Sequence, residues 1–295
     1  MRAAVLGAFP YPYPQGSQVF ATDHSRALVR AGSSVALFTY GAGTGPVPED
    51  LECVASPSWL SPPAMRSGPT LAKFPADAGV LATYIRASRV RRFDVAFAHN
   101  AEAAMIGLAA RFITGTPVIY IAHTILEHEL SAYAPEQFAG VLTQTGRQID
   151  RFIARRANGI VALCEDARAD LARHATCPIE VMAPGLDPEP APDEVDVAKI
   201  CEEHNLGPGG YALYCGNMDG YQDLDLLAEA ARTMKARHPD ISLPIVVASH
   251  DTSRIPDSFF GLTNLTCVTV RDFAQTRALI AGAQSVVLCL SLIHI

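Results

Sequence analysis

Positive charge is in short supply in this sequence. Lys and Arg total 23 against 30 Asp and Glu, which gives a formal net charge of −7. Non-specific nucleic-acid binding depends on cations that neutralise phosphates. An acidic chain is a poor candidate for that class of protein, and we expect no nucleic-acid partner.

Paired cysteines and long apolar runs are also missing. The seven cysteines are scattered and none forms a C-x-x-C pair, which argues against zinc ribbons, redox dithiols and a disulfide framework. No apolar stretch approaches the roughly 20 residues needed to cross a bilayer, and the N-terminal apolar run is too short for a signal peptide. We therefore expect a cytoplasmic protein, with peripheral contact on the inner membrane surface left open.

The sequence does contain a regular alternation of apolar runs and amphipathic stretches of helical length. Apolar residues make up 49% of the 295 residues, enough for a sizeable core. This alternation predicts β-α-β units that build a parallel sheet with helices on both faces. The predicted strands are 2–8, 34–40, 94–98, 117–122, 159–163, 179–182, 211–215, 244–248, 265–270 and 285–290. The predicted helices are 18–31, 101–112, 137–157, 165–174, 221–237 and 273–282.

Two series of such units are separated by a stretch that begins acidic and rich in proline. We predict an α/β protein of two doubly wound Rossmann-like domains, residues 1–187 and 209–295, joined by a linker over 188–208. The default ligand site is a cleft between the domains. The second domain ends at an apolar strand with no covering helix, so we expect it to be incomplete. The tail 290–295 resembles a translated sequencing adapter.

The loop after the first strand is one candidate site. Prolines alternate over 10–14, Gly16 then permits close approach to the backbone, and Ser17 can cap a helix beginning at Gln18. A helix N-terminus at the carboxyl end of a strand is suited to an anion. An ordinary strand–helix turn explains the spacing equally well, and G-x-G-x-x-G is absent.

The second domain has a loop at the matching position. Gly216 and Gly220 bracket the segment between a predicted strand and a predicted helix. Its backbone N–H groups can face a phosphate. Two such loops, one per domain, point to an anion site more strongly than either loop alone.

Two histidines end neighbouring predicted strands. His99, followed by Asn100, ends the strand 94–98, and His123 ends the strand 117–122. Ligands bind at the carboxyl ends of parallel strands in this architecture. A single strand-end histidine is more often structural, but two at equivalent strand ends favour a site.

Two other features have competing interpretations. Glu127, His128 and Glu129 follow His123, but H-E-x-x-H is absent and we predict no metal site. Arg147, Arg151 and Arg155 share one face of the helix 137–157 and apolar residues the other, which favours a core-packed helix with a solvated basic face. The alternative is attraction of that face to an anionic membrane surface or acceptor.

Several segments, taken in order, resemble a known family. They are residues 15–18, the strand-end His99 and His123, and residues 161–166, 182–187 and 214–217. Together they are similar to GT-B glycosyltransferases of family 4, and the resemblance covers nearly all of residues 1–290. Pro184-Gly185-Leu186-Asp187 is similar to the P-x-G-[IV]-D element that ends the family's N-terminal domain.

The resemblance implies that the protein transfers a sugar from a nucleotide-diphosphate donor, with retention of configuration and with no metal or other cofactor. The acceptor, a glycan, a lipid or a small molecule, is not identified by it. His123 takes the catalytic role, contacting the sugar or phosphate and stabilising charge on the leaving diphosphate. The implied donor-binding residues are Gly16, Gly216, Asn217 and Gln222. The implied acceptor-side residues are Ser17, Gln18, His99 and Asn100.

The sequence departs from the family pattern in two places. The family has G-R and then K-G, whose cations clamp the diphosphate, whereas Asn217, Gln222 and Asp223 stand here and add no positive charge. The E-x(7)-E motif that grips the donor sugar and ribose should follow the last predicted strand, where the chain ends. We therefore expect residues 1–295 alone to be inactive.

Two alternative functions are compatible with these features. One is a non-catalytic GT-B-like sugar-binding fragment. The other is a GT-B sugar-nucleotide epimerase, which needs acid/base carboxylates in the cleft, and the sequence assigns none. An E-x(7)-E motif in a longer reading frame favours the transferase.

Overall fold

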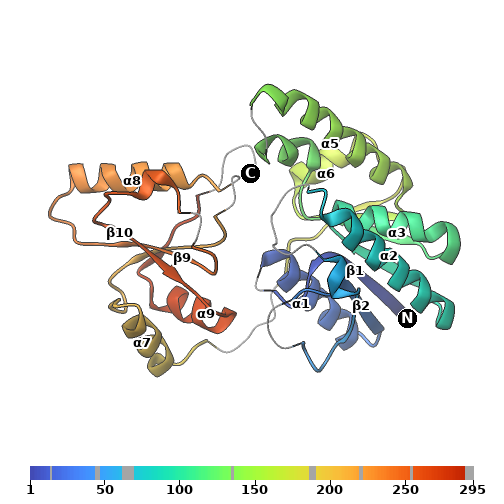
Figure 1. Ribbon diagram of the computed structural model, residues 1–295, viewed down its shortest axis with the longest axis horizontal. Coiled ribbons are helices and arrows are strands. Elements are labelled where there is room, and N and C mark those ends of the chain that lie inside the picture. The colour runs from blue at the N-terminus through green and yellow to red at the C-terminus, as the bar shows by residue number, and fades with distance from the viewer. Residues whose placement is uncertain are drawn as a thin grey trace. The chain divides into compact units, whose positions relative to one another are not determined.

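The computed structural model describes residues 1–13, 15–43, 47–61, 70–133, 136–185, 191–218, 222–252 and 255–289. The chain divides into two compact units, unit 1 (residues 1–187) and unit 2 (residues 188–295). Each unit has one parallel sheet with helices packed on it (Figure 1). The α/β class with two doubly wound, Rossmann-like units is confirmed.

The sheet of unit 1 has seven strands in the order β3-β2-β1-β4-β5-β6-β7, all parallel. The strands are β1 (Arg2–Pro10), β2 (Ser34–Tyr40), β3 (Glu52–Ala55), β4 (Val95–His99), β5 (Val118–Ala122), β6 (Gly159–Ala162) and β7 (Ile179–Val181). The strand order reverses between β1 and β4. In open parallel sheets ligands bind beyond the carboxyl ends of the strands at such a point.

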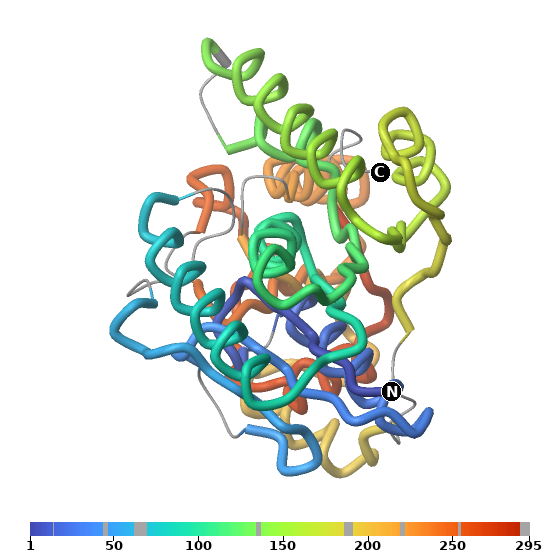
Figure 2. The backbone as a smooth tube through the Cα atoms, turned by 90° about the vertical axis from the view of Figure 1, so that its right-hand side faces the viewer, coloured from blue at the N-terminus to red at the C-terminus, as the bar shows by residue number. Residues whose placement is uncertain are grey.

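Helices cover both faces of this sheet. They are α1 (Gly16–Arg30), α2 (Lys73–Val90), α3 (Ala101–Thr114), α4 (Leu126–Glu129), α5 (Glu136–Arg156) and α6 (Glu165–Ala172), with 3₁₀ turns η1 (Ser58–Leu60) and η2 (Leu130–Tyr133). Helices α2 and α3 lie side by side on one face (Figures 1 and 2). Leu6 of β1 belongs to the core on that face, and Val5 packs in the core on the α1 face. A central parallel strand must be apolar on both sides, which explains the unbroken apolar run of β1.

Five of the described elements of unit 1 were not predicted: β3, η1, α2, α4 and η2. No strand or helix was predicted between residues 41 and 69, yet β3 pairs with β2 there as a short edge strand. Helix α2 contains Gly79, which weakens a helical pattern. A Cβ at Gly79 would lie 2.9 Å from the side chain of Leu60, so the glycine allows η1 to pack on the helix.

Unit 2 is a smaller version of the same architecture. Its four parallel strands have the order β10-β9-β8-β11. They are β8 (Ala212–Cys215), β9 (Ile245–Ser249), β10 (Leu265–Thr269) and β11 (Ser285–Val286), with helices α7 (Glu194–Glu203), α8 (Leu224–Arg237) and α9 (Phe273–Gly282) and a 3₁₀ turn η3 (Asp257–Phe259).

In the part of the chain that is described, no helix has the length and hydropathy needed to span a membrane.

Residues 188–208 hold a helix where a linker was predicted. Helix α7 packs against α9, and its Cys201 is fully buried beside the hydroxyl of Tyr211. That hydroxyl donates to the carbonyl of Leu279 on α9 at 2.6 Å. Because the segment starts with several prolines, the helix that follows them was not predicted. The apolar residues of this helix belong to the core of unit 2. The predicted tail 290–295 and residues 186–190, including Leu186 and Asp187 of the family-like element, lie outside the described residues.

Candidate functional site

One face of α1 points toward the carboxyl ends of β4 and β5. Ser17, Phe20 and His24 follow one another at i, i+3 and i+7, so their side chains share that face. His99 is the last residue of β4, and His123 comes directly after β5, which pairs with β4. The helix face and the two strand ends therefore bring these five side chains together.

Three histidines and one serine are connected by hydrogen bonds in a row, which we call the histidine relay. Nδ1 of His24 lies 2.9 Å from Nε2 of His99, and Nδ1 of His99 lies 2.9 Å from Nε2 of His123. Nδ1 of His123 lies 3.2 Å from Oγ of Ser17. Within the relay, the two strand-end histidines singled out in the sequence are in direct contact with each other and with the start of α1.

Burial keeps the relay uncharged. His99 is fully buried, and desolvation lowers its pKa well below the ordinary value, with His123 and His24 adding to the effect. Burial also lowers the pKa of His24 and of His123 to about 4. Phe20 closes one side, with its ring centroid 5.3 Å from that of His99 and 5.2 Å from that of His123. All three imidazoles are therefore neutral near pH 7.

The start of α1 differs from the prediction. The helix begins at Gly16 rather than Gln18, and among the described residues no side chain caps its N-terminus. The expected capping role of Ser17 is therefore wrong, because its hydroxyl bonds to His123 instead. Gly16 is exposed, and a Cβ there would meet no described atom within 4 Å. Among the described residues, the first turn of α1 thus has no side-chain cap and begins at an exposed glycine.

Gln18 and Asn100 have local bonding that the sequence did not reveal. Gln18 is buried, and its Nε2 donates to the carbonyl of Pro10 at 3.4 Å, while Oε1 has no partner among the described residues. Asn100 has a φ of 78° and caps α3, with its Oδ1 accepting from the N–H of Ala103 at 3.0 Å. Asn100 thereby holds the turn that follows His99.

Sequence reasoning missed two groups of residues at this edge of the sheet. His24 was overlooked, although its helical spacing from Ser17 was a usable signal. Tyr40, at the end of β2, donates to the carboxylate of Asp77 on α2, and burial raises the pKa of Asp77 to about 6. Lys73 and Glu102 form an ion pair beside it, with Nζ and Oε1 3.5 Å apart. A buried carboxyl with a perturbed pKa is a marker of functional sites.

Glu127, His128 and Glu129, which follow His123, are each bonded to another side chain of unit 1. Glu127 pairs with Arg147 at 2.6 Å, His128 with Asp170 at 2.7 Å, and Glu129 accepts from the hydroxyl of Tyr133 at 2.8 Å. Among the described residues, no three His, Cys, Asp or Glu side chains are grouped so as to hold a metal ion.

Helix α5 is packed in the core through the second half of its apolar side, where Ile153 is fully buried. In the first half, the apolar Phe138 and Val141 are 53% and 67% exposed, which was not expected. The helix packs closely on α4 through Gly146, where a Cβ would lie 2.2 Å from the carbonyl oxygen of Leu126. One turn later, the buried Asp150 accepts from the N–H of Glu127 at 2.9 Å.

In unit 2, the candidate residues follow β8. The N–H of Gly216 donates to the carbonyl of Ala248 at 3.1 Å and so is not available to a phosphate. A Cβ at Gly216 would lie 2.8 Å from the hydroxyl of Tyr214, which donates to the carbonyl of Asn217 at 2.8 Å. Asp223, preceded by the half-buried Gln222, caps α8 by accepting from the N–H of Leu226 at 3.2 Å. Gly220 lies outside the described residues.

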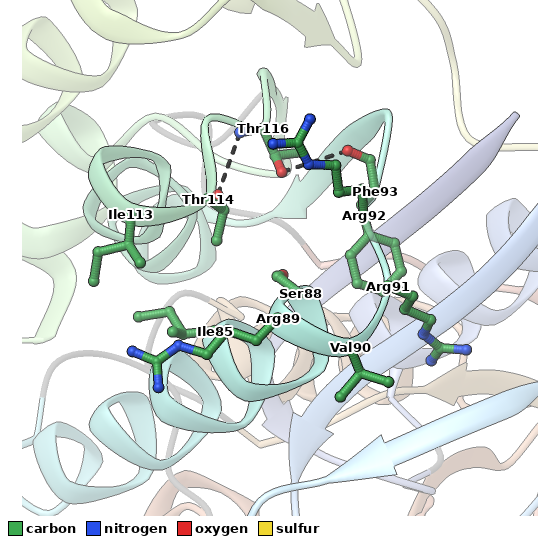
Figure 3. Close-up of a pocket in the computed structure, with 10 residues that line it drawn as sticks. All are labelled: Ile85, Ser88, Arg89, Val90, Arg91, Arg92, Phe93, Ile113, Thr114 and Thr116. Atoms are coloured by element: carbon green, nitrogen blue, oxygen red, sulfur yellow. Dashed lines mark hydrogen bonds between the residues drawn. The ribbon is translucent and has the colours of Figure 1, made fainter.

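A cavity of about 300 Å³ lies at the opposite edge of the unit 1 sheet (Figure 3). Phe93 and Thr116, which line it, precede β4 and β5, whereas His99 and His123 stand at the carboxyl ends. Arg91, also in its wall, is paired with Glu52. The cavity is therefore separate from the histidine relay.

Comparisons with known proteins support the glycosyltransferase resemblance noted in the sequence. The family model of Glycosyltransferase Family 4 matches residues 14–190. A D-inositol 3-phosphate glycosyltransferase of Salinispora arenicola is 27% identical over 273 residues, and the match covers 83% of this chain and 59% of that protein. The chain thus spans less than two thirds of that relative's length.

Solved structures with similar folds include two cyanobacterial proteins. HepE of Anabaena, in complex with UDP-glucose, gives a TM-score of 0.66 at 14% identity, over 97% of this chain and 73% of that chain. Sucrose-phosphate synthase from Thermosynechococcus elongatus gives 0.69 at 14% identity, over 99% and 77%. At this identity the likeness shows a shared fold.

Proposed function

The chain belongs to Glycosyltransferase Family 4, and from this premise we propose that the protein is a retaining glycosyltransferase that moves a sugar from a nucleotide-diphosphate donor to an acceptor hydroxyl. The observation that carries the proposal is the open start of α1 beside the histidine relay. Uncapped helix N–H groups and the positive end of the helix dipole favour an anion, and the neutral relay supplies polar groups next to it. A donor diphosphate is an anion of this kind.

Gly16 is central to the donor-binding part of the proposal. Its backbone is helical and a Cβ would meet no described atom, so the surrounding protein gives no steric reason for glycine. A ligand that approaches the backbone closely does give one. Asn217 and Gln222 of unit 2 are proposed to contact the nucleotide part through neutral hydrogen bonds, in place of a cationic clamp; Gly216, whose N–H is bonded to Ala248, is no longer proposed as a donor contact. HepE of Anabaena was solved with UDP-glucose, which makes UDP-sugars the first donors to try.

His123 is proposed to contribute to stabilising the charge that develops on the leaving diphosphate, through its hydrogen bond to Ser17. Because its pKa is about 4, it does so as a neutral hydrogen-bonding group and not as a cation. Loss of one preorganised donor lowers turnover by about 10²–10³. We therefore expect His123→Ala to reduce turnover by that factor without preventing folding.

The acceptor is proposed to be a small hydroxyl-rich molecule. Tyr40, Asp77, Lys73 and Glu102 gather polar groups of both charge signs at the same edge of the sheet as His99. Carboxylates and a cation in one place suit a polyol or a polyol phosphate. The relative from Salinispora arenicola is named for D-inositol 3-phosphate. Asp77→Asn should raise the KM for the acceptor more than the KM for the donor.

Peripheral membrane contact has one supporting observation, the exposure of Phe138 and Val141 on the helix that also carries Arg151 and Arg155. Sedimentation with anionic vesicles tests it. Val141→Asp should reduce vesicle binding, whereas Val90→Asp, at a still more exposed site on α2, should not. Equal binding by both variants would contradict the contact.

The proposed reaction is tested with a panel of UDP-, GDP- and ADP-sugars and with inositol phosphates and other polyols as acceptors. The assay is run on residues 1–295 and on the complete reading frame that contains them, which also tests the expectation that residues 1–295 alone are inactive. NMR of the product gives the anomeric configuration, and a retained configuration is expected.

The same assay separates the alternatives. A transferase releases the nucleoside diphosphate only when the acceptor is present. An epimerase interconverts nucleotide sugars without any acceptor, and a non-catalytic binding protein leaves the donor unchanged. Either of the last two results, obtained on the complete reading frame, would contradict the proposed function.

A further inference from the structure

The histidine relay is a chain of hydrogen bonds with one shared direction. A neutral imidazole has one N–H donor and one unprotonated acceptor nitrogen. Each of the three bonds contains one proton between its two heavy atoms. A histidine that donates through one nitrogen must accept through the other, so the direction of one bond fixes the direction of all three.

His123 is not the end of this chain. Its Nε2 bonds to Nδ1 of His99, and its Nδ1 bonds to Oγ of Ser17. Both of its ring nitrogens are thus engaged inside the protein. The polar atom at the terminus is the hydroxyl of Ser17, which does not cap the helix and stands beside Gly16 at the open start of α1.

We infer that Oγ of Ser17, rather than a nitrogen of His123, makes the hydrogen bond to the donor diphosphate, and that His24 and His99 are positioning residues that set the direction of this bond through His123. The inference rests on the proposed function. A serine hydroxyl rotates freely when it has no partner. The bond from His123 restricts that rotation before the donor binds, which is the preorganisation that makes a hydrogen bond effective in catalysis.

The chemistry of the ligand fixes the direction of the relay. A diphosphate oxygen only accepts, so Ser17 must donate outward when the donor is bound. Ser17 then accepts from Nδ1–H of His123, His123 accepts at Nε2 from Nδ1–H of His99, and His99 accepts at Nε2 from Nδ1–H of His24. The donor-bound state therefore has the proton on Nδ1 in all three histidines.

The opposite direction places every proton on Nε2, with Ser17 donating inward to His123. Converting that state to the donor-bound one moves each proton along its own hydrogen bond. One proton is taken up from water at Oγ of Ser17, and one is released to water from Nε2 of the partly exposed His24. The net charge of the relay does not change.

Nitrogen-15 NMR of the labelled protein, expressed from the complete reading frame that contains residues 1–295, tests this assignment directly, because protonated and unprotonated ring nitrogens resonate far apart. The probes are UDP, GDP and ADP. With a diphosphate bound, the proton is expected on Nδ1 of both His99 and His123, and a proton on Nε2 of either would overturn the inference. If none of the three binds, the proposed function fails. The free protein then still tests the relay, since mixed tautomers among the three histidines would overturn it.

Substitutions separate Ser17 from His123 as the contacting group. Ser17→Ala should lower kcat by about 10²–10³-fold, and Ser17→Thr, which keeps the hydroxyl, should restore most of it. His123→Ala should cost a similar factor, and the double variant no more than either single one, because His123 acts through Ser17. His123 makes the contact itself if Ser17→Ala lowers kcat only slightly, while His123→Ala lowers kcat by the full factor both in the wild type and in the Ser17→Ala variant.

His24 provides a matched pair for the positioning role. His24→Asn keeps an amide near the place of Nδ1 that can donate or accept, whereas His24→Phe keeps the ring and removes both nitrogens. We expect His24→Phe to lower kcat with little change in the donor KM, and His24→Asn to keep most of the kcat. Equal kcat values in the two variants would contradict the positioning role, whatever their stabilities.

Discussion

Acidification should destabilise unit 1 through the histidine relay. Burial lowers the pKa of His24 and His123 from 6.5 to about 4. Because the unfolded chain binds more protons between these values, the stabilisation is present above pH 6.5 and is lost as the pH falls toward 4. At about 1.4 kcal/mol per pH unit, the full loss is about 3 kcal/mol for each histidine. About 2 kcal/mol of it is lost by pH 5.

Urea unfolding followed by circular dichroism at pH 7 and pH 5 measures this loss. His24→Asn removes one titrating group, so its unfolding free energy should fall by about 2 kcal/mol less than that of the wild type between the two pH values. His238→Asn, at an exposed position in unit 2, is the control and should behave as the wild type does. If His24→Asn and the wild type lose the same free energy, His24 is not held neutral in a buried relay and the reasoning is refuted.

Three further predictions follow from other parts of the chain. Gly146→Ala should destabilise the protein by about 1–3 kcal/mol in thermal unfolding, because the new Cβ would overlap the carbonyl of Leu126; an unchanged melting temperature would contradict the close packing of α5 on α4. Asp223→Ala should cost about 1 kcal/mol by removing the cap of α8, whereas loss of donor binding without loss of stability would assign Asp223 to the site. Sugar transfer should be unchanged by EDTA, and a loss that Mg²⁺ or Mn²⁺ restores would contradict the metal-free mechanism.

The sheet was predictable because its strands are marked by local composition. β2 was predicted with its observed bounds, 34–40, since an apolar run between polar and glycine-rich neighbours identifies a buried strand. β3 was not, because an edge strand with one neighbour and half-buried residues has no such run. α7 was missed for a related reason: its apolar residues belong to a core that only the folded unit 2 reveals.

The candidate site was predictable only in part. That His99 and His123 end neighbouring strands follows from the strand pattern. The relay does not, because it needs α1 to turn its Ser17–His24 face toward those strand ends, and helix packing is set by the whole core. For the same reason Ser17 was assigned to capping, whereas its hydroxyl bonds to His123, and the capping of α3 by Asn100 was not predicted.

Donor binding by the Gly16→Ala variant tests the central claim most directly. Alanine suits the helical backbone at this position and should stabilise the fold by about 0.4–1 kcal/mol, so a loss of function cannot come from unfolding. Calorimetric titration of the complete reading frame with UDP-, GDP- and ADP-sugars compares the variant with the wild type. The account predicts that one of these donors binds the wild type and that the variant binds it at least about tenfold more weakly, which is about 1.4 kcal/mol. Equal affinity in the two proteins would contradict a donor site at the start of α1.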